Sequence, residues 1–457
     1  MDLGLAHNTA LLLWTGLAVA GLVVLIVGFK LNAFVALTLA SLGLGLASGM
    51  EMTAVAKAFQ DGVGGTLGFI AVVVGLGTML GKMLAESGGA EVIARTLIRA
   101  CGERRLPWAV MFVAFLIGLP VFFGVGVVLL VPIVFTLART TQTPLLQLGI
   151  PMVAGLSAAH GLVPPHPGVM AAIAVFEPGR VDVGKTILYG ILVGLPVAVL
   201  AGPLFAKLIV PKIPGRIGGI GEQLMNPKPV ANPPSFATAL FTILLPVLLM
   251  LLATLADFVL PKGDRLRAWA DFLGSPAMAM LAAVLVSFVT FGTHCGFARA
   301  QILKFTEDCV GPAAAIMLVV GAGGGFGKVL DVAEVDQAII LRVAGTSLSP
   351  LLLGWLITGV LRVAVGSATV AITLAAGIMA PLVAATPGVN LELLIVAMGA
   401  GSLILSHLND GGFWFVKEYL NLSVAETLKT WTVLETIIAV AGLLLVLVFD
   451  AIIRYCF

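Results

Sequence analysis

Three short segments of the sequence combine ionisable or hydroxyl side chains with proline or glycine inside long apolar runs. An arginine guanidinium binds a carboxylate through two parallel hydrogen bonds. Serine and threonine hydroxyls bind the hydroxyl groups of a polar solute, and histidine exchanges protons near neutral pH. Together these types predict a binding site for a small hydroxylated anion, with these candidate residues: Ser157, His160, Pro164, His166, Arg362, Gly366, Ser367, Thr369, Ser406, His407, Asn409 and Asp410.

Prolines and polar residues predict that two of these segments interrupt apolar helices. Pro164, Pro165 and Pro167 follow His160 closely. A proline cannot continue a helix, and it pushes the residue before it toward extended geometry. The segment 402–414 ends its apolar run in the same way, with histidine, asparagine and aspartate. Unwound backbone here would leave peptide N–H and C=O groups free to bind a polar solute.

The composition indicates a membrane protein. Hydrophobic residues occupy 60% of the 457 positions and charged residues only 11%, whereas a soluble domain carries about 25% charged residues. The net charge of +2 and the four cysteines without metal-ligand spacing predict no nucleic-acid partner, no metal and no cofactor. Apolar runs near the length that a spanning helix needs recur near 10–28, 31–49, 66–84, 145–162, 186–210, 236–258, 275–291, 313–330, 391–406 and 433–455. We therefore expect an all-α, polytopic protein surrounded by membrane lipid.

Each ionisable residue at the predicted breaks has a structural interpretation and a functional one. His160 and His407 either hydrogen-bond at a helix end or carry protons. Asp410 either caps the following helix or exchanges a proton, and Arg362 either pairs with an acid or binds a carboxylate. Because ionisable groups at membrane depth are rare and usually functional, His160, His407 and Asp410 are the candidates for proton coupling.

Two further apolar stretches, 107–138 and 350–384, are too long for one crossing. Each is interrupted near its middle, at 119–126 and 362–369, by glycine with proline or small polar residues. A re-entrant hairpin fits this pattern, because non-helical backbone at membrane depth occurs only where protein or a water-filled cavity satisfies it. Two ordinary helices joined by a tight turn are the alternative.

The two halves of the chain resemble each other. Residues 73–84 and 319–330 are identical at seven of twelve positions, at a constant offset of 246. The loop after the first copy is rich in arginine. Its counterpart, 331–349, carries three acidic residues and one arginine. Since arginine-rich short loops stay in the cytoplasm, equivalent loops are expected on opposite sides. We therefore expect an inverted repeat, typical of secondary transporters, with a first unit at 1–210, a proline-rich cytoplasmic linker at 211–235 and a second unit at 236–457.

Several of these segments resemble the gluconate permease (GntP) family over nearly the whole chain. The resemblance rests on 30–34, 75–90, 157–168, 362–370 and 406–414. It implies a scaffold, a moving transport domain with two hairpins (an elevator mechanism) and a homodimer. It also implies proton symport of gluconate or related sugar acids, and of D-serine in one branch. Members of the family often carry an acid where this chain has Gly124; if that acid takes part in proton coupling, coupling here is either placed elsewhere or weakened.

We therefore expect a secondary active transporter that imports gluconate or a related sugar acid with protons across a bacterial inner membrane, and not an enzyme. Other small hydroxylated carboxylates or D-serine remain alternative substrates, and an uncoupled anion uniporter is an alternative mechanism. A membrane-embedded hydrolase or transferase using His160, His166 and His407 is a third possibility. No activated Ser/His/Asp arrangement, HExxH motif or phosphate-binding loop supports it.

Overall fold

The computed structural model describes residues 2–102, 105–176, 181–213, 230, 232–261, 263–335, 338, 348–386, 388–408 and 410–456. Every regular element within these ranges is helical, which confirms the all-α prediction. The first half contains α1 (Asp2–Val23), α2 (Ala33–Ala47), α3 (Met52–Glu86), α4 (Gly89–Cys101), α5 (Leu106–Gly118), α6 (Phe123–Thr140), α7 (Leu145–Leu162), α8 (Pro167–Val175), α9 (Val183–Val199) and α10 (Phe205–Ile209). The second half contains α12 (Phe236–Val259), α13 (Arg265–Gly274), α14 (Pro276–Ser287), α15 (Arg299–Asp308), α16 (Val310–Val332), α18 (Pro350–Val365), α19 (Ala368–Ala385), α20 (Leu391–Gly401), α21 (Gly411–Tyr419), α22 (Val424–Thr427) and α23 (Val433–Cys456).

Among the described residues, 7 helical stretches are long and apolar enough to cross a membrane, and α3, bent by 42°, raises the number to 8. The chain is therefore a multi-pass membrane protein. The predicted span 145–162 coincides with α7. The span predicted at 391–406 contains an α-helix of only 11 residues, α20, which ends at Gly401 and is followed by a turn.

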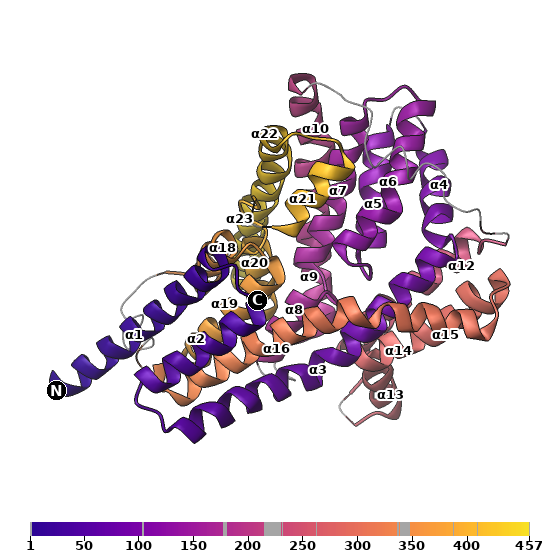
Figure 1. Ribbon diagram of the computed structural model, residues 1–457. Helices are drawn as coiled ribbons and strands as arrows, with labels where there is room; N and C mark the ends of the chain where they lie inside the picture. The colour runs from indigo at the N-terminus through magenta and orange to yellow at the C-terminus, as the bar shows by residue number, and fades with distance from the viewer. Residues whose placement is uncertain are drawn as a thin grey trace.

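The long helices α3 and α16 lie side by side along one edge of the molecule (Figure 1). Glycines allow this close contact: a Cβ added to Gly62 of α3 would lie 2.5 Å from the backbone oxygen of Gly324 in α16. Small residues at such a contact let helix backbones approach and gain van der Waals energy where lipid supplies little hydrophobic driving force. These two helices contain the matching segments 73–84 and 319–330.

Both predicted interruptions occur, between α5 and α6 and between α18 and α19. At the second, Gly366 adopts φ +79°, in the left-handed region that glycine enters without a Cβ penalty. The next residue, Ser367, caps α19 by accepting a hydrogen bond from the backbone N–H of Val370. That each pair is a re-entrant hairpin, and that the halves form an inverted repeat, stay predictions. Most of the linker predicted at 211–235 lies outside the described residues, which omit 214–229 and 231.

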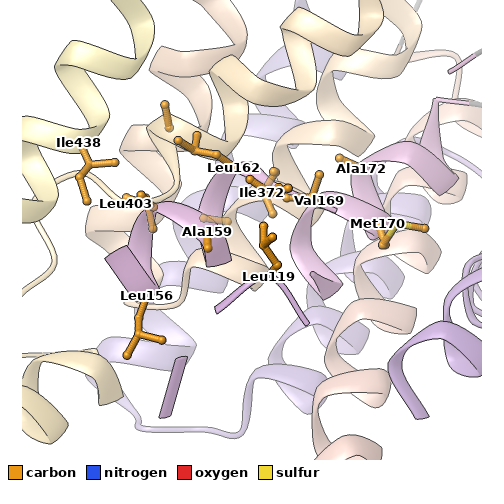
Figure 2. Close-up of a cluster of buried hydrophobic side chains, with 14 of the residues drawn as sticks. Leu119, Leu156, Ala159, Leu162, Val169, Met170, Ala172, Ile372, Leu403 and Ile438 are labelled. Carbon is orange, nitrogen blue, oxygen red and sulfur yellow. The ribbon is translucent and has the colours of Figure 1, made fainter. Parts of the chain in front are cut away.

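Buried apolar side chains hold these interruptions in place. They come from the α5–α6 break, from α7, α8, α19 and α23, and from the turn after α20, and each is at most 3% exposed. Such close packing fixes the direction in which the helix ends point. Figure 2 shows the cluster, with labels on Leu119, Leu156, Ala159, Leu162, Val169, Met170, Ala172, Ile372, Leu403 and Ile438.

Candidate substrate cavity

A cavity of about 260 Å³ lies where the two helix interruptions meet α7, α21 and the start of α23. Six predicted site residues line it: Ser157, His160, Arg362, Ser367, Thr369 and Asp410. Its remaining lining residues are Phe122, Phe123, Gly124, Ala368, Leu403, Gly411, Gly412, Phe415, Trp431 and Glu435. A larger hollow of about 830 Å³ lies at 138–147 and 210–213, but the one charged side chain among its described lining residues, Arg139, is exposed. We therefore take the smaller cavity as the candidate site.

Arg362 and Asp410 form an ion pair in the cavity wall. Arg362 Nη2 donates to Asp410 Oδ2 at 2.5 Å, and the arginine side chain is only 2% exposed. The other two guanidinium nitrogens, Nε and Nη1, are buried and have no hydrogen-bond partner among the described residues. Arg362 thus pairs with an acid, as one interpretation of the sequence proposed, and still has two unsatisfied donors.

Asp410 is held by several donors besides Arg362. The Ser406 hydroxyl donates to Oδ2, and the backbone N–H of Gly412 donates to Oδ1 at 2.9 Å, so Asp410 also caps α21. Ser406 is itself positioned by the Trp431 indole N–H, which donates to the serine oxygen at 2.7 Å. Ser406 is buried and does not line the cavity. Its role is to orient the aspartate.

His160 forms the end of a hydrogen-bonded chain that leads away from the cavity. Its Nδ1 lies 3.1 Å from Nδ1 of His166, and His166 Nε2 lies 2.5 Å from the carbonyl oxygen of Gly118. A carbonyl only accepts, so His166 Nε2 carries the hydrogen; with both rings neutral, His160 Nδ1–H then donates to His166. Nε2 of His160 is left as an acceptor for a solute hydroxyl. His166 is buried behind the cavity rather than in its lining.

The other four predicted site residues lie outside the described lining. Pro164 and Gly366 are buried in the helix interruptions, where they shape the backbone. His407 is partly exposed, and its Nε2–H donates to the carbonyl oxygen of Val363 at 3.1 Å. Asn409 is not among the described residues. Of the two candidate histidines at the predicted breaks, His160 lines the cavity and His407 does not.

Three helices begin at the cavity: α6, α19 and α21. The side chains of Ser367 and Asp410 cap α19 and α21, whereas no side chain caps the N-terminus of α6. The peptide N–H groups in the first turn of a helix have no partner within it and carry partial positive charge. The cavity therefore favours an anion.

Glu435 is a cavity residue that the sequence reasoning missed. Only 1% of its side chain is exposed, and Oε1 has no hydrogen-bond partner in the described ranges. Its carboxyl interacts with the Ser157 hydroxyl of α7 and lies within electrostatic reach of Arg362 and Asp410. The sequence did carry a signal, because Glu435 is an acid inside the predicted span 433–455. The other acid of that span, Asp450, pairs with Arg454 at 2.9 Å.

Comparison with known proteins places the chain in a family. Residues 10–452 match the model of the GntP family permeases. The chain belongs to the GntP permease family. It is 51% identical to the gluconate permease of Pseudomonas aeruginosa over 97% of this chain and 98% of that protein. It is 47% identical to the gluconate permease of Zymomonas mobilis over 96% and 98%.

A solved structure supports the fold. The YdaH transporter of Alcanivorax borkumensis superposes with a TM-score of 0.66 at 18% identity, covering 92% of this chain and 98% of that one. The resemblance expected from the sequence is thus confirmed, and this GntP-family protein is a transporter, not an enzyme. A permease binds and releases its solute unchanged, so a candidate site needs groups that recognise the solute rather than groups that react with it.

The aromatic side chains in the lining were also missed. Phe122, Phe123, Phe415 and Trp431 line the cavity, and the rings of Phe123 and Trp431 lie 5.1 Å apart. No ionisable or hydroxyl group marks these residues, and in an apolar sequence aromatic side chains are not distinctive. Aromatic rings in a cavity offer apolar surface against which the carbon skeleton of a ligand can pack.

Proposed function

We propose that this GntP-family permease imports gluconate or a related sugar acid, together with protons, across the bacterial inner membrane. Two relatives with 51% and 47% identity are named gluconate permeases. One observation carries the proposal within the structure. Arg362, buried in the wall of a cavity of about 260 Å³, has two donors without a partner in the described part of the chain.

These donors favour a carboxylate as the ligand. A buried donor without a partner costs about 1–3 kcal/mol. The free Nε–H and Nη1–H point to different sides of the guanidinium, so a ligand carboxylate can accept from Nη1 while a second ligand oxygen, such as a hydroxyl, accepts from Nε. The uncapped first turn of α6, at Phe123 and Gly124, also lines the cavity and adds favourable partial charge. Because Arg362 Nη2 stays on Asp410, carboxylate binding leaves this ion pair intact.

The rest of the cavity suits a polyhydroxylated chain. Ser157, Ser367 and Thr369 contribute hydroxyl groups to the lining, and His160 contributes an acceptor nitrogen. These groups come from α7 and from the start of α19. One carboxylate with several hydroxyls, the composition of a sugar acid, matches this distribution of one cationic group and several hydrogen-bonding groups.

The proposal extends to architecture and assembly. Units 1–210 and 236–457, joined by the linker 211–235, form an inverted repeat that works as an elevator within a homodimer. The order of elements supports the repeat, because both units contain a long helix, an interrupted helix pair, a helix that ends at the cavity and a short helix. In the first unit these are α3, α5–α6, α7 and α8, and in the second they are α16, α18–α19, α20 and α21.

Uptake of labelled gluconate into proteoliposomes tests the function. When the outside is more acidic than the lumen, we expect labelled gluconate to accumulate inside above its external concentration. Without a pH gradient, we expect the two concentrations only to become equal. Excess unlabelled sugar acids and excess D-serine, added separately, rank the substrates. Equilibration of gluconate that the pH gradient does not affect would indicate an uncoupled uniporter. If D-serine inhibits uptake and the sugar acids do not, D-serine replaces gluconate as the proposed substrate. Liposomes with protein denatured before reconstitution give the background.

A further inference from the structure

We propose that Glu435 is the group that takes up the transported proton when the substrate binds. This inference rests on the proposed function, because it assigns the proton-binding residue of the same cavity. Glu435 is a carboxylic acid that is 1% exposed, lines the cavity and has a partnerless Oε1 among the described residues. A proton bound there forms an O–H bond on that oxygen and lies beside the substrate.

The charges around the cavity make substrate and proton binding cooperative. Arg362 and Asp410 cancel each other as an ion pair, so an ionised Glu435 leaves one net negative charge in the lining. A substrate carboxylate adds a second negative charge inside a site of low dielectric, where like charges repel strongly. Protonation of Glu435 removes this repulsion. Each ligand therefore favours the binding of the other, and this coupling is reciprocal.

The groups that face Glu435 come from three neighbouring parts of the fold. Arg362 of α18 and Asp410, just before α21, act on it electrostatically, and the Ser157 hydroxyl of α7 contacts its carboxyl. His160 of α7 lines the same cavity. Of these, Arg362 favours the ionised glutamate and Asp410 opposes it, and a substrate carboxylate would add to the opposition.

The other ionisable groups of the cavity are already engaged. Asp410 accepts from Arg362, Ser406 and the backbone of Gly412. Asp410 is thus held by three donors, one of which is the cationic Arg362. His160 donates to His166 through Nδ1 and offers Nε2 as the acceptor for a substrate hydroxyl, so a proton taken up on Nε2 would compete with substrate binding. Glu435, with its partnerless Oε1, can accept a proton without breaking an existing contact.

Proton uptake on gluconate binding tests this assignment on the purified full chain. Calorimetric titration in two buffers with different ionisation enthalpies counts the protons taken up for each gluconate bound. For the wild type we expect proton uptake, and affinity that falls by up to about tenfold per unit rise in pH, as linkage of one proton requires. Glu435→Gln, which resembles the protonated side chain, should bind gluconate with no proton uptake and with affinity independent of pH.

Two variants control for structural effects. Asp450→Asn makes the same kind of change on the same helix, away from the cavity, and should keep the proton uptake of the wild type. Glu435→Asp retains a carboxyl and should restore uptake. If Glu435→Gln does not fold, His160→Gln replaces it in the test. Proton uptake retained by His160→Gln supports Glu435, and uptake abolished by it overturns the role of Glu435.

The remaining outcomes separate this inference from the proposed function. Proton uptake that persists in folded Glu435→Gln overturns the role of Glu435 and leaves gluconate transport untouched. A wild type that binds gluconate without taking up protons overturns the role as well. Failure of the wild type to bind gluconate counts against the proposed substrate; the same titrations with other small hydroxylated carboxylates then decide the role of Glu435.

Discussion

Replacing Arg362 by lysine separates recognition of the substrate carboxylate from pairing with Asp410. The arginine is 2% exposed and donates to Asp410 at 2.5 Å through Nη2. A lysine keeps the positive charge beside this aspartate, but its ammonium cannot reproduce the planar fork of a guanidinium. Removal of the charge altogether, as in Arg362→Met, would leave Asp410 buried without its charged partner at a cost of about 3–5 kcal/mol. Lysine is therefore the informative substitution.

The expected loss of affinity follows from the donors that disappear. Arg362 has two donors, Nε and Nη1, without a partner in the described structure. A hydrogen bond to a charged group contributes about 1.5–3 kcal/mol. Loss of one such bond weakens gluconate binding by about 10- to 100-fold, since 1.4 kcal/mol corresponds to about tenfold in affinity. Folding should change little, because the charge next to Asp410 is conserved.

Direct binding of labelled gluconate to purified protein measures this loss, with the thermal midpoint of each variant as the check on folding. Arg454→Lys is the matched control: it makes the same substitution in an ion pair with Asp450 near the end of α23, away from the cavity. It should bind gluconate as the wild type does. Wild-type affinity in a folded Arg362→Lys protein would refute the assignment of Arg362 to the carboxylate.

Three further predictions concern the support of the cavity, helix packing and topology. Trp431→Phe removes the indole donor that positions Ser406 and, through it, the ion pair. This hydrogen bond contributes about 0.5–1.5 kcal/mol, so gluconate binding should weaken by about 2- to 10-fold. Unchanged affinity would contradict this role. Gly155→Ala places a Cβ 2.3 Å from a backbone oxygen of α5 and should lower the free energy of unfolding by about 1–3 kcal/mol, seen as a lower thermal midpoint. Gly75→Ala, with nothing within 4 Å of the added Cβ, should not. Thr96 and Val332 are both exposed. In a variant without the four native cysteines, a thiol reagent should label Thr96→Cys from the cytoplasm only and Val332→Cys from outside only. Labelling of both from one side would end the inverted-repeat hypothesis.

The sequence alone determines where the helices lie and where they break. The thickness of the hydrocarbon layer sets the length of an apolar run, so the runs at 145–162 and 236–258 predict α7 and α12 almost residue for residue. Glycine and proline act on their own backbone, and the interruptions near 119–126 and 362–369 follow from them. Both effects are local, and they do not depend on which other helix is adjacent.

Only the tertiary structure decides which polar groups meet. Arg362 and Asp410 are separated by 48 residues, and Glu435 reaches the same cavity from the start of α23. His160 and His407 both follow apolar runs at predicted breaks, yet His160 lines the cavity and His407 contacts the backbone of α18. The partner of a hydrogen bond depends on how helix ends converge. That convergence is fixed by packing among distant residues such as Leu119, Ile372 and Ile438 (Figure 2), which no local pattern encodes.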